Sequence, residues 1–164
     1  MIGPLAASTF EIVLAVHIMA VVVAFGVTFA YPIMFAVGSK ASPRSLPVLH
    51  RVAYTIDRWL VNPGLLVVFG AGIYLASELD QWSAFFVQWG FAAVFVIGAL
   101  AGSVMIPTGK KAEQAAERDI AAAGDGEVVM GEEYQRLVRR LSRVGAGLSL
   151  LVLVTILFMV IKPG

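Results

Sequence analysis

Four long apolar segments dominate the chain, and most polar residues lie in the stretches between them. The segments cover residues 10–37, 59–79, 82–106 and 144–161. A helix needs about 20 residues to cross the ~30 Å hydrocarbon core of a bilayer, and each segment is close to or above that length. The pattern predicts an all-α fold, an integral membrane bundle of four transmembrane helices that residues 1–164 form as a single domain.

Helical periodicity continues into the polar stretches on one side of the predicted bundle. Apolar residues recur at three- and four-residue spacing before the second span, which predicts a helix that starts early and bends at Pro63. Residues 108–143 contain two helix-forming arms joined by Gly124-Asp125-Gly126. We therefore expect a cytoplasmic helical hairpin over residues 108–143.

The distribution of basic residues predicts the orientation of the bundle. The net charge is only +1, but nearly all lysines and arginines lie in the loops between spans one and two and between spans three and four. Such loops face the cytoplasm, so both termini should lie outside. No basic residue precedes the first apolar segment, which favours a retained helix over a cleaved signal peptide. The basic residues thus indicate a bilayer partner and no nucleic acid.

The residues of the first span suggest one candidate site. His17 is the only histidine within a predicted span, and a stripe of small or polar residues continues from it through Ala20, Ala24, Thr28 and Tyr31. Such a stripe points into a bundle. An inward imidazole can ligate haem iron or another metal, relay protons, or donate a hydrogen bond to a neighbouring carbonyl. If His17 ligates a cofactor, we expect haem b, with its porphyrin beside Ala20 and Ala24 and between the first helix and the second or third.

The other histidine and the absence of cysteine limit this chemistry. Without cysteine the chain has no disulfide, thiolate metal site or CxxCH haem attachment. His50 lies in the cytoplasmic loop, and we expect it at the surface or at headgroup level. A bis-histidine haem within one chain is therefore not expected, and a second ligand would be methionine, water or a residue of another subunit.

Other residues are expected to serve packing and lipid binding. Gly98 and Gly102 form a GxxxG motif, and Gly145 and Ser149 play the same part in the last span, within the bundle or between subunits. A basic helical face just below the membrane should bind anionic headgroups, or pair with Glu113 and Glu117. That face consists of Arg136, Arg139, Arg140 and Arg143.

Three short motifs resemble a bacterial family of small four-helix predicted integral membrane proteins of unassigned function. They are Leu14-Ala-Val-His17, the run from Arg58 to Gly64, and Gly72-Ile-Tyr-Leu75. The order of elements is more distantly similar to membrane protoporphyrinogen oxidases and copper-resistance D proteins. The resemblance implies a location in the bacterial inner (plasma) membrane and, from the oxidases, a haem-binding role for His17.

One departure from the oxidase pattern argues against oxidase chemistry. Those enzymes carry a histidine and a lysine near the start of the third helix, whereas residues 85–90 of this chain contain only Gln88 as a strongly polar side chain. No motif of a soluble-type active site is present either. Two interpretations follow. The chain is a non-catalytic subunit or scaffold, self-associating or part of a larger membrane complex, or a haem- or metal-binding redox protein centred on His17.

Overall fold

The computed structural model describes residues 7–163 and is all-helical over that range, which confirms the predicted fold class. Four helices are long and apolar enough to cross a membrane: Thr9–Ala41, Pro43–Glu78, Phe85–Ala123 and Glu132–Ile161. In lipid every backbone N–H and C=O must be paired within the protein, and a helix achieves this within one segment. The expectation that the first helix is not a cleaved leader rests partly on residues 1–6, which lie outside the described range.

Three of the four long helices are made of several consecutive pieces. The first contains α1 (Thr9–Gly26), the 3-10 turn η1 (Val27–Ala30) and α2 (Tyr31–Ala41). The second contains η2 (Pro43–Ser45), α3 (Leu46–Ile56), the π-helical η3 (Asp57–Val61) and α4 (Asn62–Glu78). The third contains α5 (Phe85–Leu100), the π-helical η4 (Ala101–Met105) and α6 (Ile106–Ala123), and the fourth is α7 (Glu132–Ile161).

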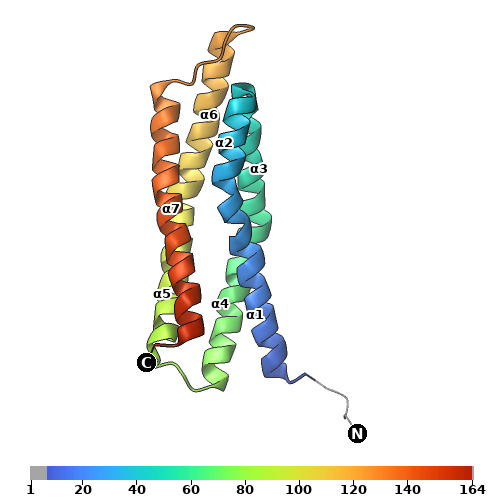
Figure 1. The fold of residues 1–164 in the computed structure, drawn as a ribbon, viewed down its shortest axis with the longest axis vertical. Helices are drawn as coiled ribbons and strands as arrows, with labels where there is room; N and C mark the ends of the chain where they lie inside the picture. The colour runs from blue at the N-terminus through green and yellow to red at the C-terminus, as the bar shows by residue number, and fades with distance from the viewer. Residues whose placement is uncertain (1–6, 164) are drawn as a thin grey trace.

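The helices are longer than a membrane requires, and their polar parts lie together at one end of the bundle. At 1.5 Å per residue the shortest of them, α7, is about 45 Å long, against a hydrocarbon core of ~30 Å. Figure 1 shows α1 beginning and α7 ending at the same end of the bundle as the α4–α5 connection. We call the part containing α1, α4, α5 and residues 148–161 the apolar half. The part containing α2, α3, α6 and residues 132–143 is the basic half.

Local sequence signals explain where several helices begin and end. Ser8 and Glu11 form a capping box at the start of α1, with each side chain bonded to the backbone of the other residue. The helix α6 stops at Gly124, whose φ of 55° suits glycine. The helix α5 begins at Phe85 rather than at Trp82, because residues 79–84 form the connection from α4 and the Trp82 ring stacks on Phe91.

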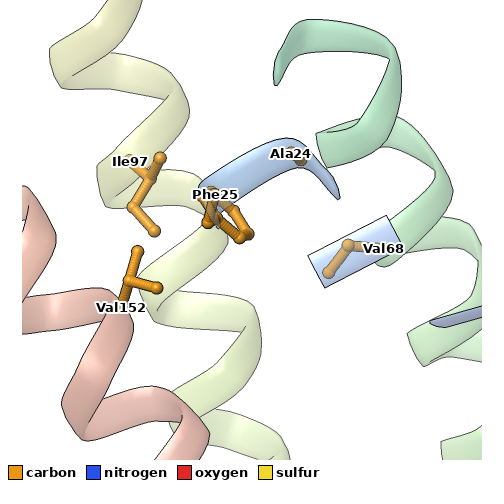
Figure 2. Packing of buried hydrophobic residues seen from close by; sticks show 5 residues of the cluster. All are labelled: Ala24, Phe25, Val68, Ile97 and Val152. Atoms are coloured by element: carbon orange, nitrogen blue, oxygen red, sulfur yellow. The ribbon is translucent and has the colours of Figure 1, made fainter. Parts of the chain in front are cut away.

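Each half has its own buried cluster. In the apolar half Ala24, Phe25, Val68, Ile97 and Val152 come from all four long helices and meet at one level (Figure 2). In the basic half the core contains Leu46, Ala112, Ala115, Ala116 and Tyr134. The small alanines of α6 let α3 and α7 pack closely on it, so the basic half is a packed helical module and not a set of loose loops.

A belt of irregular helix separates the two halves. The segments η1, η3 and η4 each precede an α-helix with proline at its second position: Pro32, Pro63 and Pro107. Proline lacks the N–H that a regular helix would donate there and crowds the preceding turn, which accounts for the local departure from α-geometry. We refer to these three segments with their prolines as the proline belt.

Candidate functional site

His17 lies on α1 in the apolar half and faces α4. Its ring lies beside the backbone of Val68 and beside Gly72, where an added methyl group would be 3.7 Å from the imidazole Cε1. The imidazole Nδ1 is buried and has no hydrogen-bond partner among residues 7–163. A buried ring nitrogen without a partner costs about 1–3 kcal/mol, and the backbone of Val68, close enough to hydrogen-bond the ring, offsets part of that cost.

The small residues that follow His17 do not leave an open slot beside it. Ala24 is fully buried, and a methyl group added to Gly64 would lie 2.5 Å from the Ala24 Cβ and 3.7 Å from the Ala20 carbonyl oxygen. Since α4 fills this face of α1, a porphyrin does not fit between the two helices at this level. In the described part of the chain no group of three or more His, Cys, Asp or Glu side chains is placed to hold a metal.

The remaining candidate packing residues occupy different surroundings. A methyl group on Gly98 would lie 3.6 Å from the Leu65 side chain, and one on Gly145 would lie 3.8 Å from the Met105 methyl. Ser149 is half-buried. Gly102 is exposed, and nothing in residues 7–163 would lie within 4 Å of an added methyl group. Among the described residues of one chain, therefore, Gly98 faces another helix and Gly102 does not.

A polar pair lies at the proline belt, where α1 and α3 continue into their next segments. The Tyr31 hydroxyl donates a 2.8 Å hydrogen bond to the Asp57 carboxylate. It also approaches the Ala53 carbonyl at 3.5 Å. The pair ties the first long helix to the second at the level where both lose α-geometry, and it accounts for the polar end of the stripe that starts at His17.

The expectation that His50 lies at the surface is wrong. His50 is only 6% exposed, its Nε2 is 3.4 Å from the Tyr134 hydroxyl, and its ring lies 4.7 Å from that of Phe35. Burial lowers the pKa of His50 to about 4, partly offset by the Glu113 carboxylate. Helical spacing in the sequence could have predicted this burial, because His50 is four residues after the buried Leu46 and lies on the same face of α3.

Arginines of the basic half divide into paired and unpaired groups. Arg51 binds Glu113 at 2.8 Å and Glu117 at 2.9 Å, and Arg118 binds Glu133 at 3.0 Å. Glu113 and Glu117 therefore form ion pairs with Arg51 of α3 and not with the arginines of α7. The members of that face are exposed and form no ion pair with any described residue: Arg136, Arg139, Arg140 and Arg143.

An open apolar groove lies in the basic half, between the start of α7, the end of α2 and the segment that precedes α7. Its volume is about 520 Å³. Val129, on the preceding segment, is 74% exposed, and Arg139 is the one charged residue among the described residues that line the groove. The lining consists of Ser39, Pro43, Leu46, Val128, Val129, Met130, Tyr134, Gln135, Val138 and Arg139. This groove combines exposed apolar surface with the guanidinium group of Arg139, which has no acidic partner among the described residues.

Together these features define a helical integral membrane protein with four candidate spanning helices and a polar extension that carries an open groove. Comparison with family models places the chain more narrowly. It belongs to the family described as "Predicted integral membrane protein (DUF2269)", whose model matches residues 11–163. That description gives a membrane location and no activity. No curated protein matches the chain, and no solved structure does.

Proposed function

We propose that this protein is a non-catalytic scaffold subunit that anchors a partner protein at the membrane. The groove of the basic half carries this proposal, because apolar surface such as Val129 is costly to leave open in water. The one buried imidazole of the basic half, His50, is enclosed by Phe35 and Tyr134 and does not line the groove. The lining residues that the structure describes are suited to binding and include no pair of nucleophile and base.

The orientation that goes with this proposal puts the basic half in the cytoplasm of a bacterial cell and both termini outside the inner membrane. The support is the positive-inside rule. Single cysteines in this cysteine-free chain can test it with an impermeant thiol reagent on intact cells. Ser83→Cys, in the α4–α5 connection, should be labelled and Lys111→Cys should be protected. Ser83 is preferable to Asp80, whose φ of 49° would strain a substitution. The reverse labelling would overturn the orientation.

The scaffold function can be tested by photocrosslinking in native membranes. A benzophenone amino acid at position 129 should give a discrete adduct with one partner protein, identified by mass spectrometry. The matched control is position 122, which is exposed on α6 and does not line the groove. Absence of an adduct at 129, or the same adducts from both positions, would contradict the scaffold function. An adduct of twice the chain mass would identify the partner as a second copy.

A second candidate function is a haem- or metal-binding redox protein centred on His17. The buried, unpaired Nδ1 favours it, together with the distant resemblance to the oxidases and copper-resistance proteins. The close approach of Ala24 to Gly64 counts against a porphyrin between α1 and α4. Purification after haem supplementation should give a Soret band that His17→Ala abolishes in a folded protein. A colourless, metal-free wild-type protein would leave His17 as a packing residue.

A further inference from the structure

The segment that forms one wall of the groove has unused main-chain hydrogen-bonding groups. Residues 127–131 run from the end of the α6 turn to α7 without a turn or bend. The backbone N–H groups of Val128, Val129 and Met130, and the carbonyls of Val128 and Val129, form no hydrogen bond within residues 7–163. Such a segment can accept a second extended chain alongside it.

Both ends of this segment are fixed by side chains of the basic half. The Arg44 guanidinium donates to the carbonyls of Gly124 and Gly126. At the other end the Asp119 carboxylate accepts a 2.8 Å hydrogen bond from the N–H of Gly131, and the Gln135 amide donates to the Met130 carbonyl. The free groups are therefore held in place before a ligand arrives, which lowers the entropic cost of binding.

The side chains around the segment specify what would lie beside it. Val128, Met130, Leu46 and Val138 supply apolar contact. Arg139 is exposed, lines the groove and has no acidic partner among the described residues. The carboxylates of Glu127 and Glu132 flank the segment but do not line the groove. The lining therefore favours a ligand that combines apolar side chains with a carboxylate.

We propose, building on the scaffold function above, that the groove binds an extended segment of a partner protein in which apolar residues accompany an acidic one. The segment pairs its main chain with that of Val128–Met130, and its carboxylate meets Arg139. Main-chain pairing supplies affinity without demanding a fixed sequence, while the apolar contacts and the single cation set the side-chain preference.

Short synthetic peptides can test this with the full-length protein in lipid nanodiscs. The probes alternate valine with polar residues and carry aspartate, asparagine or lysine at one central position, and binding is followed by fluorescence anisotropy. The aspartate peptide should bind about tenfold more tightly than the asparagine peptide. N-methylation of its backbone amides should abolish binding, because the methyl groups remove the donors and block close approach.

Substitutions at Arg139 separate the charge contact from general attraction to a basic surface. Arg139→Gln should remove the preference for aspartate, and Arg139→Glu should transfer it to the lysine peptide. The matched control is Arg143→Gln, on the same helix but outside the groove, which should leave binding unchanged. The proposed binding mode would be overturned if all peptides bound with equal affinity. It would also be overturned if the N-methylated peptide bound as well as the unmodified one, or if no peptide bound.

These outcomes are distinguishable from failure of the scaffold function itself. If an adduct forms at position 129 but no peptide binds, the scaffold function stands, and the proposal that the partner binds as an extended segment is wrong. An adduct between two copies of this chain assigns the groove to self-association and overturns the mode as well. If peptides bind but no adduct forms in native membranes, the groove is a peptide-binding site and the scaffold function is wrong.

Discussion

The apolar half and the basic half are stabilised in different ways although the same long helices run through both. In the apolar half large side chains such as Leu66 and Val160 are more than 70% exposed, and packing depends on small residues such as Ala24 against Gly64. In the basic half Ala112 and Ala116 are fully buried, and ion pairs connect its helices. Surface apolar groups cost nothing in lipid, whereas in water they must be buried.

The two halves meet at the proline belt, which suggests why the helices change character there. A regular helix would carry one face continuously through both environments. The 3-10 and π-helical stretches alter the residue spacing just before Pro32, Pro63 and Pro107, so the face that packs inward can change between the halves. The comparison thus predicts that single substitutions act through different mechanisms in the two halves.

The largest effect is expected where the apolar half depends on close helix approach. Gly64→Leu places a side chain where an added methyl group would already be 2.5 Å from Ala24, and should destabilise the protein by about 3 kcal/mol. The control is Gly70→Leu on the same helix, where no atom of the described residues would lie within 4 Å of an added methyl group. Thermal unfolding in nanodiscs provides the measurement. Equal melting temperatures for the two variants would mean that α1 and α4 do not depend on this contact.

Acid should destabilise the basic half through His50. The unfolded chain binds a proton below a pKa of 6.5, whereas the folded protein keeps His50 neutral down to about 4. The unfolded state therefore binds more protons in this window, and the free energy of unfolding should fall by about 3 kcal/mol between pH 6.5 and 4. Denaturant titrations across this range test it. His50→Gln should remove this contribution, and an unchanged pH profile would show that His50 is solvated.

The basic face of α7 should contribute smaller, separable amounts to lipid binding. Replacing Arg136, Arg140 or Arg143 singly with glutamine should weaken binding of phosphatidylglycerol by about 1 kcal/mol, roughly fivefold. The reason is that these guanidinium groups are exposed and form no ion pair among residues 7–163. Native mass spectrometry of lipid-bound protein can measure it. Arg51→Gln is the control, because Arg51 is already bound to Glu113 and Glu117. Equal losses for all four variants would rule out a specific lipid-binding face.

The smallest effect is expected at the ion pairs between α3 and α6. Arg51→Gln should cost about 0.5 kcal/mol, and this loss should shrink at high salt, because the Arg51 side chain is 62% exposed. Arg58→Gln serves as the control, because Arg58 is exposed and forms no ion pair with a residue that the structure describes. A salt-independent loss at Arg51 would instead point to packing of its apolar stem as the cause.

The sequence pattern alone predicted the four spanning helices and the two helical arms joined at Gly124, and the structure has both. It also marked Pro63 as a point of irregularity, where the helix is π-helical. These features depend on hydropathy, helix propensity and proline, which act within one segment of chain. The burial of His50 was missed, because its neighbours Phe35 and Tyr134 come from other helices. The groove was missed for the same reason, since its lining combines α2, α3, α7 and the segment between α6 and α7.

In the apolar half a further limit is physical. Lipid and protein interior are equally apolar, so hydropathy marks a spanning helix without showing which of its faces meets another helix. Gly98 and Gly102 therefore looked equivalent in sequence, and only the tertiary structure separates Gly98, against Leu65, from the open Gly102. The sequence determined that the chain crosses a membrane and where its charges lie. The tertiary structure decided which small residues meet, which arginines form ion pairs among residues 7–163 and where the groove lies, because these depend on contacts between helices distant in sequence.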